Sequence, residues 1–170
     1  MDYSFFAYLQ QLELMAFFSG YPLIYAVTLF FAGNQQAKND FKSRIVSLLP
    51  FAYALLGTLY LGLQLKNLYP DYSFENIKLT MQQPFLIIWA LLSILFWIPA
   101  LAKKSLLSLL HSLVFFFFLA RDLFLHSFYS VDKSVVQNNM NIYTNSLLIN
   151  LAALAFMVLI SFIVVSYKKQ

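Results

Sequence analysis

The sequence predicts an all-α integral membrane protein, a bundle of five transmembrane helices with the amino terminus outside and the carboxyl terminus in the cytoplasm. Of its 170 residues, 61% are hydrophobic and 11% are charged, and the mean hydropathy is +0.72. Soluble domains are about 45–50% apolar and about 25% charged, so a soluble fold is excluded. The basic residues stand in short clusters at the ends of five apolar runs. That placement indicates membrane topology rather than nucleic-acid binding.

The first predicted span covers residues 14–32 and contains Ser19-Gly20-Tyr21-Pro22. Proline removes a backbone donor, so we expect a kink near the middle of the membrane. A second interpretation is a broken helix whose freed backbone groups bind an ion or a substrate. The aromatic segment 3–13 is expected to form an interfacial helix that continues into this span.

The second span is predicted at residues 45–65. Small residues recur there every four positions, at Ala54, Thr58 and Gly62. They form a strip on which another helix can pack closely, and packing within the same chain is favoured over a dimer interface. The third span begins at Pro84, a residue that suits the first position of a helix, and covers residues 84–102.

The fourth span, residues 105–127, carries polar groups into the membrane. Steps of about 100° per residue place these groups on one helix face. The candidates on this polar face are Ser108, His111, Ser112, Asp122 and His126. Lipid tails cannot hydrogen-bond, so the face should meet other helices or a water-filled cavity. His111 is expected to be neutral and to bond with Ser108, Ser112 or Asn150.

Asn150 belongs to the fifth span, predicted at residues 145–167, where it shares a small and polar face with Ser146. We expect this face to meet the polar face of the fourth span. Residues 66–83 and 128–144 are predicted as the two outer loops.

Basic residues set the predicted orientation, because cytoplasmic loops carry an excess of Lys and Arg. Seven lie on one side of the five spans and four on the other. The first group is Lys38, Lys42, Arg44, Lys103, Lys104, Lys168 and Lys169, and the second is Lys66, Lys78, Arg121 and Lys133. The larger group is therefore expected in the cytoplasm.

Four charged residues are expected near the outer leaflet: Glu13, Lys66, Arg121 and Asp122. As a charge-paired cluster they would line an outward pocket for a proton, a cation or a lipid headgroup. The alternative is that each marks a helix end, with Arg121 extending toward water.

Cofactor and metal chemistry find no support in the sequence. The chain has no cysteine and two histidines, and the helical rise of about 22 Å between His111 and His126 prevents both from binding one haem iron. Zinc spacing, phosphate loops and nucleophile motifs are missing. We therefore predict no cofactor, no metal site and no catalytic residue.

The leading prediction is a single membrane domain, residues 1–170, that acts as a small non-catalytic subunit in the cell membrane. Its partners would be the lipid bilayer and other integral membrane proteins or further copies of itself, and not nucleic acid. The first alternative is a carrier or channel for a proton, a cation or a small amphiphile, lined by the polar face of the fourth span. The second is a lipid-modifying enzyme that uses Asp122 and His126.

Overall fold

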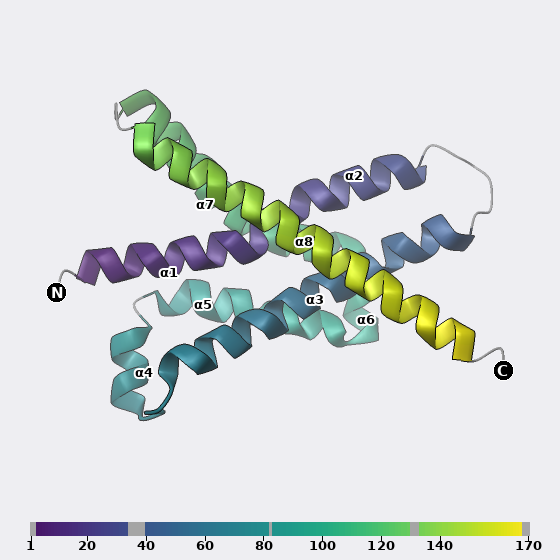
Figure 1. Cartoon of the computed structure of the whole chain (residues 1–170), viewed down its shortest axis with the longest axis horizontal. Coiled ribbons are helices and arrows are strands. Elements are labelled where there is room, and N and C mark those ends of the chain that lie inside the picture. The colour runs from purple at the N-terminus through teal and green to yellow at the C-terminus, as the bar shows by residue number, and fades with distance from the viewer. Residues whose placement is uncertain (1–2, 34–39, 82, 130–132, 168–170) are drawn as a thin grey trace.

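The computed structural model describes residues 3–33, 40–81, 83–129 and 133–167, and the secondary structure in those ranges is entirely helical (Figure 1). The α-helices are α1 (Tyr3–Phe18), α2 (Tyr21–Gly33), α3 (Asp40–Leu68), α4 (Phe74–Thr80), α5 (Pro84–Leu91), α6 (Pro99–Ala102), α7 (Ser105–Tyr129) and α8 (Lys133–Tyr167). A 3₁₀ helix, η1 (Leu92–Trp97), follows α5.

Four stretches of the described chain are long and apolar enough to cross a membrane: Gln10–Phe31, Lys42–Leu68, Ser105–Leu125 and Val136–Tyr167. The third predicted span contains a shorter apolar helical stretch, Pro84–Trp97. Ile98 then adopts an extended conformation (φ −73°, ψ 118°), as expected for a residue that precedes proline. Pro99 starts α6, so residues 84–102 form a composite of three short helices.

The first apolar stretch is broken at Ser19 and Gly20, between α1 and α2. α8 crosses this break (Figure 1), where the hydroxyl of Ser146 accepts a 2.8 Å hydrogen bond from the Gly20 amide. The side-chain amide of Asn150 donates to the Phe17 carbonyl at 3.0 Å. The polar groups of α8 thus bind the backbone groups that the break releases.

Glycine is required at the break because α8 lies directly against it. A Cβ atom at position 20 would stand 2.7 Å from the Leu147 amide nitrogen and 2.8 Å from the Ser146 carbonyl carbon. Both are backbone atoms, which cannot rotate away.

The prediction of an outer loop at residues 128–144 was wrong over most of its length, because α7 continues to Tyr129 and α8 begins at Lys133. No glycine or proline occurs after Pro99, so residues 128–144 contain no strong helix breaker. Polar composition was mistaken for a loop signal, although a polar helix is stable outside the hydrocarbon core.

The other predicted outer loop, residues 66–83, contains α4. Ser73 caps this helix by accepting a bond from the Asn76 amide at 3.3 Å, and the Asn76 side chain donates to the Asp71 carbonyl at 2.5 Å. The side-chain amide of Gln10 donates to the Thr80 carbonyl, which joins α4 to α1.

Aromatic side chains form much of the buried core. Phe18 of α1 stacks on Phe115 of α7, with ring centroids 4.9 Å apart, and meets Tyr53 of α3 edge to face at 5.6 Å. Edge-to-face and offset pairs add to the gain from burial alone. The core therefore lies where α1, α3 and α7 meet.

Candidate functional site

The amino-terminal half of the predicted polar face on α7 is covered by tyrosines. The hydroxyl of Tyr25 lies 3.0 Å from the Ser105 hydroxyl, and that of Tyr21 lies 2.8 Å from the Ser108 hydroxyl. Ser112, fully buried, donates to the carbonyl of Leu109 at 2.8 Å. These serine hydroxyls are paired inside the bundle. A buried tyrosine brings both apolar surface and a hydroxyl, which suits it to this position.

His111 lies within a cluster of aromatic rings. Its Nδ1 is 2.7 Å from the hydroxyl of Tyr53, and its ring stacks on Trp89 of α5 with centroids 4.7 Å apart and planes 5° from parallel. The indole of Trp89 also donates to the His111 carbonyl at 3.2 Å. Nε2 is buried and has no hydrogen-bond partner among the described residues. His111 therefore joins α3, α5 and α7.

The residues predicted to form one polar face separate into different environments. The His111 ring was predicted to bond with Ser108, Ser112 or Asn150. Among the described residues it bonds instead with the hydroxyl of Tyr53. Asn150 bonds α1 and its own helix. The side chain of His126 lies outside the described residues. The sequence did not identify Tyr21, Tyr25 and Tyr53 as the partners of these groups, although a tyrosine inside an apolar span indicates a polar partner nearby.

Asp122 lies near the other end of α7, on a partly exposed surface. Its carboxylate accepts a 2.9 Å hydrogen bond from the Gln11 side chain. It also forms an ion pair with the neighbouring Arg121 at 3.2 Å. The described residues contain no ion pair from Glu13 or Lys66 to this pair. Of the four charged residues predicted near the outer leaflet, the structure thus pairs two.

Glu13 lies instead within electrostatic range of Tyr60 of α3. The Tyr60 side chain is fully buried, and its hydroxyl has no hydrogen-bond partner among the described residues. Gln64 follows Tyr60 by one helical turn and is 3% exposed. Its side-chain nitrogen also has no hydrogen-bond partner among the described residues. We call these three residues the Glu13 cluster. The sequence signal that could have identified this cluster is the i, i+4 spacing of Tyr60 and Gln64 inside an apolar span.

The predicted small-residue strip of α3 has one buried and one open end. Ala54 is buried, and Thr58 accepts a 2.9 Å bond from the Trp97 indole. A Cβ atom at Gly62 would meet nothing within 4 Å. Another helix does approach α3 closely at Gly57, where a Cβ atom would stand 2.0 Å from the Ser93 hydroxyl oxygen of η1.

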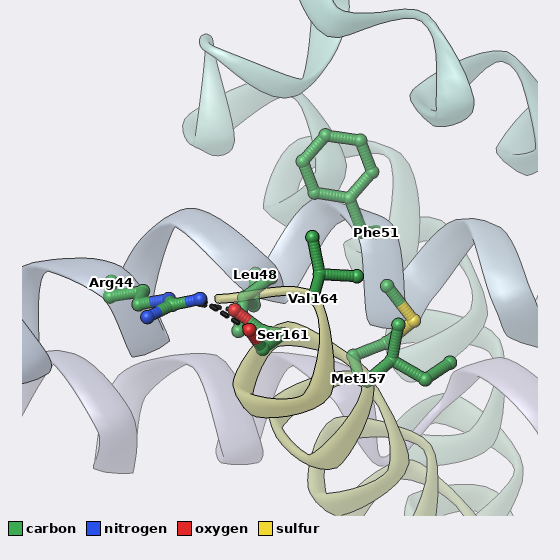
Figure 2. Close-up of a pocket in the computed structure, with 7 residues that line it drawn as sticks. Arg44, Leu48, Phe51, Met157, Ser161 and Val164 are labelled. Carbon is green, nitrogen blue, oxygen red and sulfur yellow. Dashed lines mark hydrogen bonds between the residues drawn. The ribbon is translucent and has the colours of Figure 1, made fainter. Parts of the chain in front are cut away.

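A groove of about 500 Å³ runs between α3 and α8 (Figure 2). Its lining is apolar except at Arg44 and Ser161, and we call it the Arg44 groove. The lining residues are Arg44, Leu48, Phe51, Met157, Ile160, Ser161 and Val164. Arg44 points from α3 toward α8, where Nε donates to the Ser161 hydroxyl at 2.7 Å and Nη2 donates to the Ser161 carbonyl at 2.5 Å. From the sequence, Arg44 was predicted only as one of the basic residues on the cytoplasmic side.

Among the side chains that the structure describes, no three of His, Asp and Glu are grouped so as to hold a metal ion. Comparison of the chain with protein-family models, with curated proteins and with solved structures finds no match.

Proposed function

We propose that this protein is a small non-catalytic subunit of the cell membrane, which packs against partner membrane proteins or against copies of itself. The supporting observation is the pairing of the polar face of α7 within the chain, above all the bond between Tyr53 and His111. Polar groups that line a transport path face water or a substrate, whereas these groups hold helices together. The outer surface consists largely of exposed apolar side chains, which suits lipid and partner helices.

Within this proposal the chain crosses the bilayer five times. The composite segment 84–102 includes η1, and a 3₁₀ helix rises about 2.0 Å per residue against about 1.5 Å for an α-helix. If its helices are collinear, the segment is about 30 Å long, close to the thickness of the hydrocarbon core. Figure 1 supports this crossing, since the α4 end of the segment lies near the amino terminus and the α6 end lies toward the carboxyl terminus.

The orientation is proposed with the amino terminus outside. The end of the bundle that holds the start of α3 carries Lys42 and Arg44, and Lys103 and Lys104 lie between α6 and α7. These basic residues support a cytoplasmic position for that end.

Because the sequence contains no cysteine, a single introduced cysteine can report on which side of the membrane its position lies. Single variants Ser73→Cys and Lys103→Cys would be treated with a membrane-impermeant maleimide before and after permeabilisation. Five spans predict labelling of Ser73→Cys in intact cells and of Lys103→Cys only after permeabilisation. Labelling of both from the same side would reject the crossing of residues 84–102, and the opposite pattern would reject the orientation.

The subunit role is tested by cross-linking in the membrane. Gly62 is exposed and has open space around it, so a partner helix can approach α3 closely there. Gly62→Cys should give a discrete cross-linked dimer or heteromeric adduct with a short thiol-directed reagent, whereas Ser73→Cys on the α4 loop should not. A monomer in mild detergent with no discrete adduct from Gly62→Cys or from the exposed Leu148→Cys would reject the role.

A second candidate function, a carrier or channel for a proton or cation, is favoured by the Glu13 cluster. Tyr60 lies within electrostatic range of the Glu13 carboxyl group, and Gln64 follows it by one helical turn. Both have a buried polar atom without a partner among the described residues, and polar groups of this kind inside a membrane protein mark ion pathways. For this function, Glu13→Gln should abolish flux into liposomes and Glu75→Gln on the exposed α4 should not. Equal flux in Glu13→Gln, His111→Ala and the parent protein would reject it.

A further inference from the structure

The Arg44 groove opens on the surface of the helix pair formed by α3 and α8. Ile160 and Val164 at its edge are 37% and 48% exposed, while Met157 at its base is 8% exposed. The volume of about 500 Å³ falls within the roughly 300–1,000 Å³ of small-molecule sites. An apolar groove of this size on the lipid-facing surface of a helix pair is suited to an acyl chain.

The guanidinium of Arg44 is held at the end of this groove. An arginine has five N–H donors in a planar fork, and Ser161 uses one on Nε and one on Nη2. The donors on Nη1 bond no described residue. No described carboxylate contacts the guanidinium, and the side chain of Asp40, one turn earlier, lies outside the described part of the chain. A fixed guanidinium with free donors is a binding group for a phosphate oxygen.

The position of Arg44 along α3 matches the depth of lipid headgroups. Arg44 is near the start of the apolar stretch Lys42–Leu68, and Ser161 is near the end of Val136–Tyr167. Leu48 and Phe51 follow Arg44 by one and two helical turns and line the groove with it (Figure 2). Since both lie farther along the apolar stretch than Arg44, the groove would lead from the charged end toward the membrane interior.

We propose that the Arg44 groove binds an anionic glycerophospholipid, with the phosphate on the Arg44 guanidinium and one acyl chain along Leu48, Phe51 and Met157. Selectivity comes from the headgroup, because an acyl chain gains little by leaving other lipid tails for an apolar groove. Basic pockets between transmembrane helices on the cytoplasmic side are suited to such lipids. This site does not depend on whether the protein acts as a subunit or as a carrier.

The test uses Trp97, whose ring lies 6.1 Å from that of Phe51 in the groove. Trp89→Phe leaves Trp97 as the single tryptophan, since the chain has two. This protein would be placed in phosphatidylcholine nanodiscs with a small, equal fraction of brominated phosphatidylglycerol or brominated phosphatidylcholine, and the quenching of Trp97 fluorescence would be measured. We expect the anionic lipid to be enriched about five-fold beside Trp97, the factor expected from one basic side chain.

Three variants separate this site from general surface charge. Arg44→Gln keeps a bond to Ser161 without the charge and should remove the preference for phosphatidylglycerol. Val164→Phe fills the groove, keeps the charge and should lower the preference too. Lys103→Ala removes an exposed cation from the same end and should leave it unchanged.

Two results would overturn the proposal. One is a preference that persists in Arg44→Gln or that falls equally in Lys103→Ala. The other is displacement of brominated phosphatidylglycerol by free inorganic phosphate, which would show an anion site with no part played by the acyl chain.

Discussion

The hydroxyl of Tyr53 lies 2.7 Å from Nδ1 of His111, and this hydrogen bond joins α3 to α7 within a cluster of aromatic rings. Trp89 stacks on one face of the imidazole, and Phe96 meets it edge to face at 6.0 Å. Because Nε2 is buried without a described partner, Tyr53 provides the one hydrogen bond that the ring makes among the described residues.

Tyr53→Phe is expected to destabilise the protein by about 1–3 kcal/mol, because it leaves both imidazole nitrogens buried and unpaired. The free energy of unfolding would be measured by titration from mild detergent into denaturing detergent.

The control for this loss is Tyr72→Phe, a substitution at a residue 54% exposed, which should have no measurable effect. The double variant Tyr53→Phe with His111→Phe removes both polar partners and should recover most of the loss. A double variant less stable than Tyr53→Phe alone would contradict the assignment of the cost to an unpaired imidazole.

Gly20→Ala is expected to separate α8 from the break between α1 and α2, because the new Cβ atom would stand 2.7 Å from the Leu147 amide nitrogen. Overpacking of this kind costs about 1–3 kcal/mol. The matched control is Gly62→Ala, where a Cβ atom meets nothing within 4 Å and the better helix former should be neutral or slightly stabilising. Equal stability of the two variants would contradict the close approach of α8.

Asn150→Leu should weaken the packing of α8 against the break between α1 and α2, because it removes the hydrogen bond to the Phe17 carbonyl. Side-chain hydrogen bonds between membrane helices contribute about 0.6 kcal/mol on average and up to about 1.7 kcal/mol, so the loss of stability should be small. Hydrogen exchange is the sharper measurement, with faster exchange expected at the amides near Gly20. Asn145→Leu, on an exposed position of α8, should leave that exchange unchanged, and equal exchange in both variants would reject the role of Asn150.

Gly57→Ala tests the contact between α3 and η1. The new Cβ atom would stand 2.0 Å from the Ser93 hydroxyl oxygen and 3.1 Å from the Ile94 amide nitrogen. The first conflict is with a side chain, so Gly57→Ala combined with Ser93→Ala should be more stable than Gly57→Ala alone. Thermal unfolding in detergent would rank the parent protein, the single variant and the pair, and a pair no better than Gly57→Ala would show that the backbone of Ile94 dominates the cost.

Part of the candidate site could be predicted from the sequence. Helical periodicity identified Ser108 and His111 as groups that need partners, because both lie on one face of an apolar helix. It did not identify Tyr21 and Tyr53 as those partners. Which residues of another helix stand opposite a given face depends on the axial register between helices, and periodicity within one helix contains no information on that register.

The sequence by itself determined the helical class, four long apolar stretches and the position of an irregularity near Gly20, which was expected as a kink, because these depend on local composition and on the backbone chemistry of glycine and proline. Only the tertiary structure decided that Ser146 and Asn150 bind the break, that η1 adopts a 3₁₀ conformation against Gly57, and that Arg44 bonds Ser161 beside a groove. Each of these pairs joins residues far apart in the chain, so each depends on how the helices pack against one another.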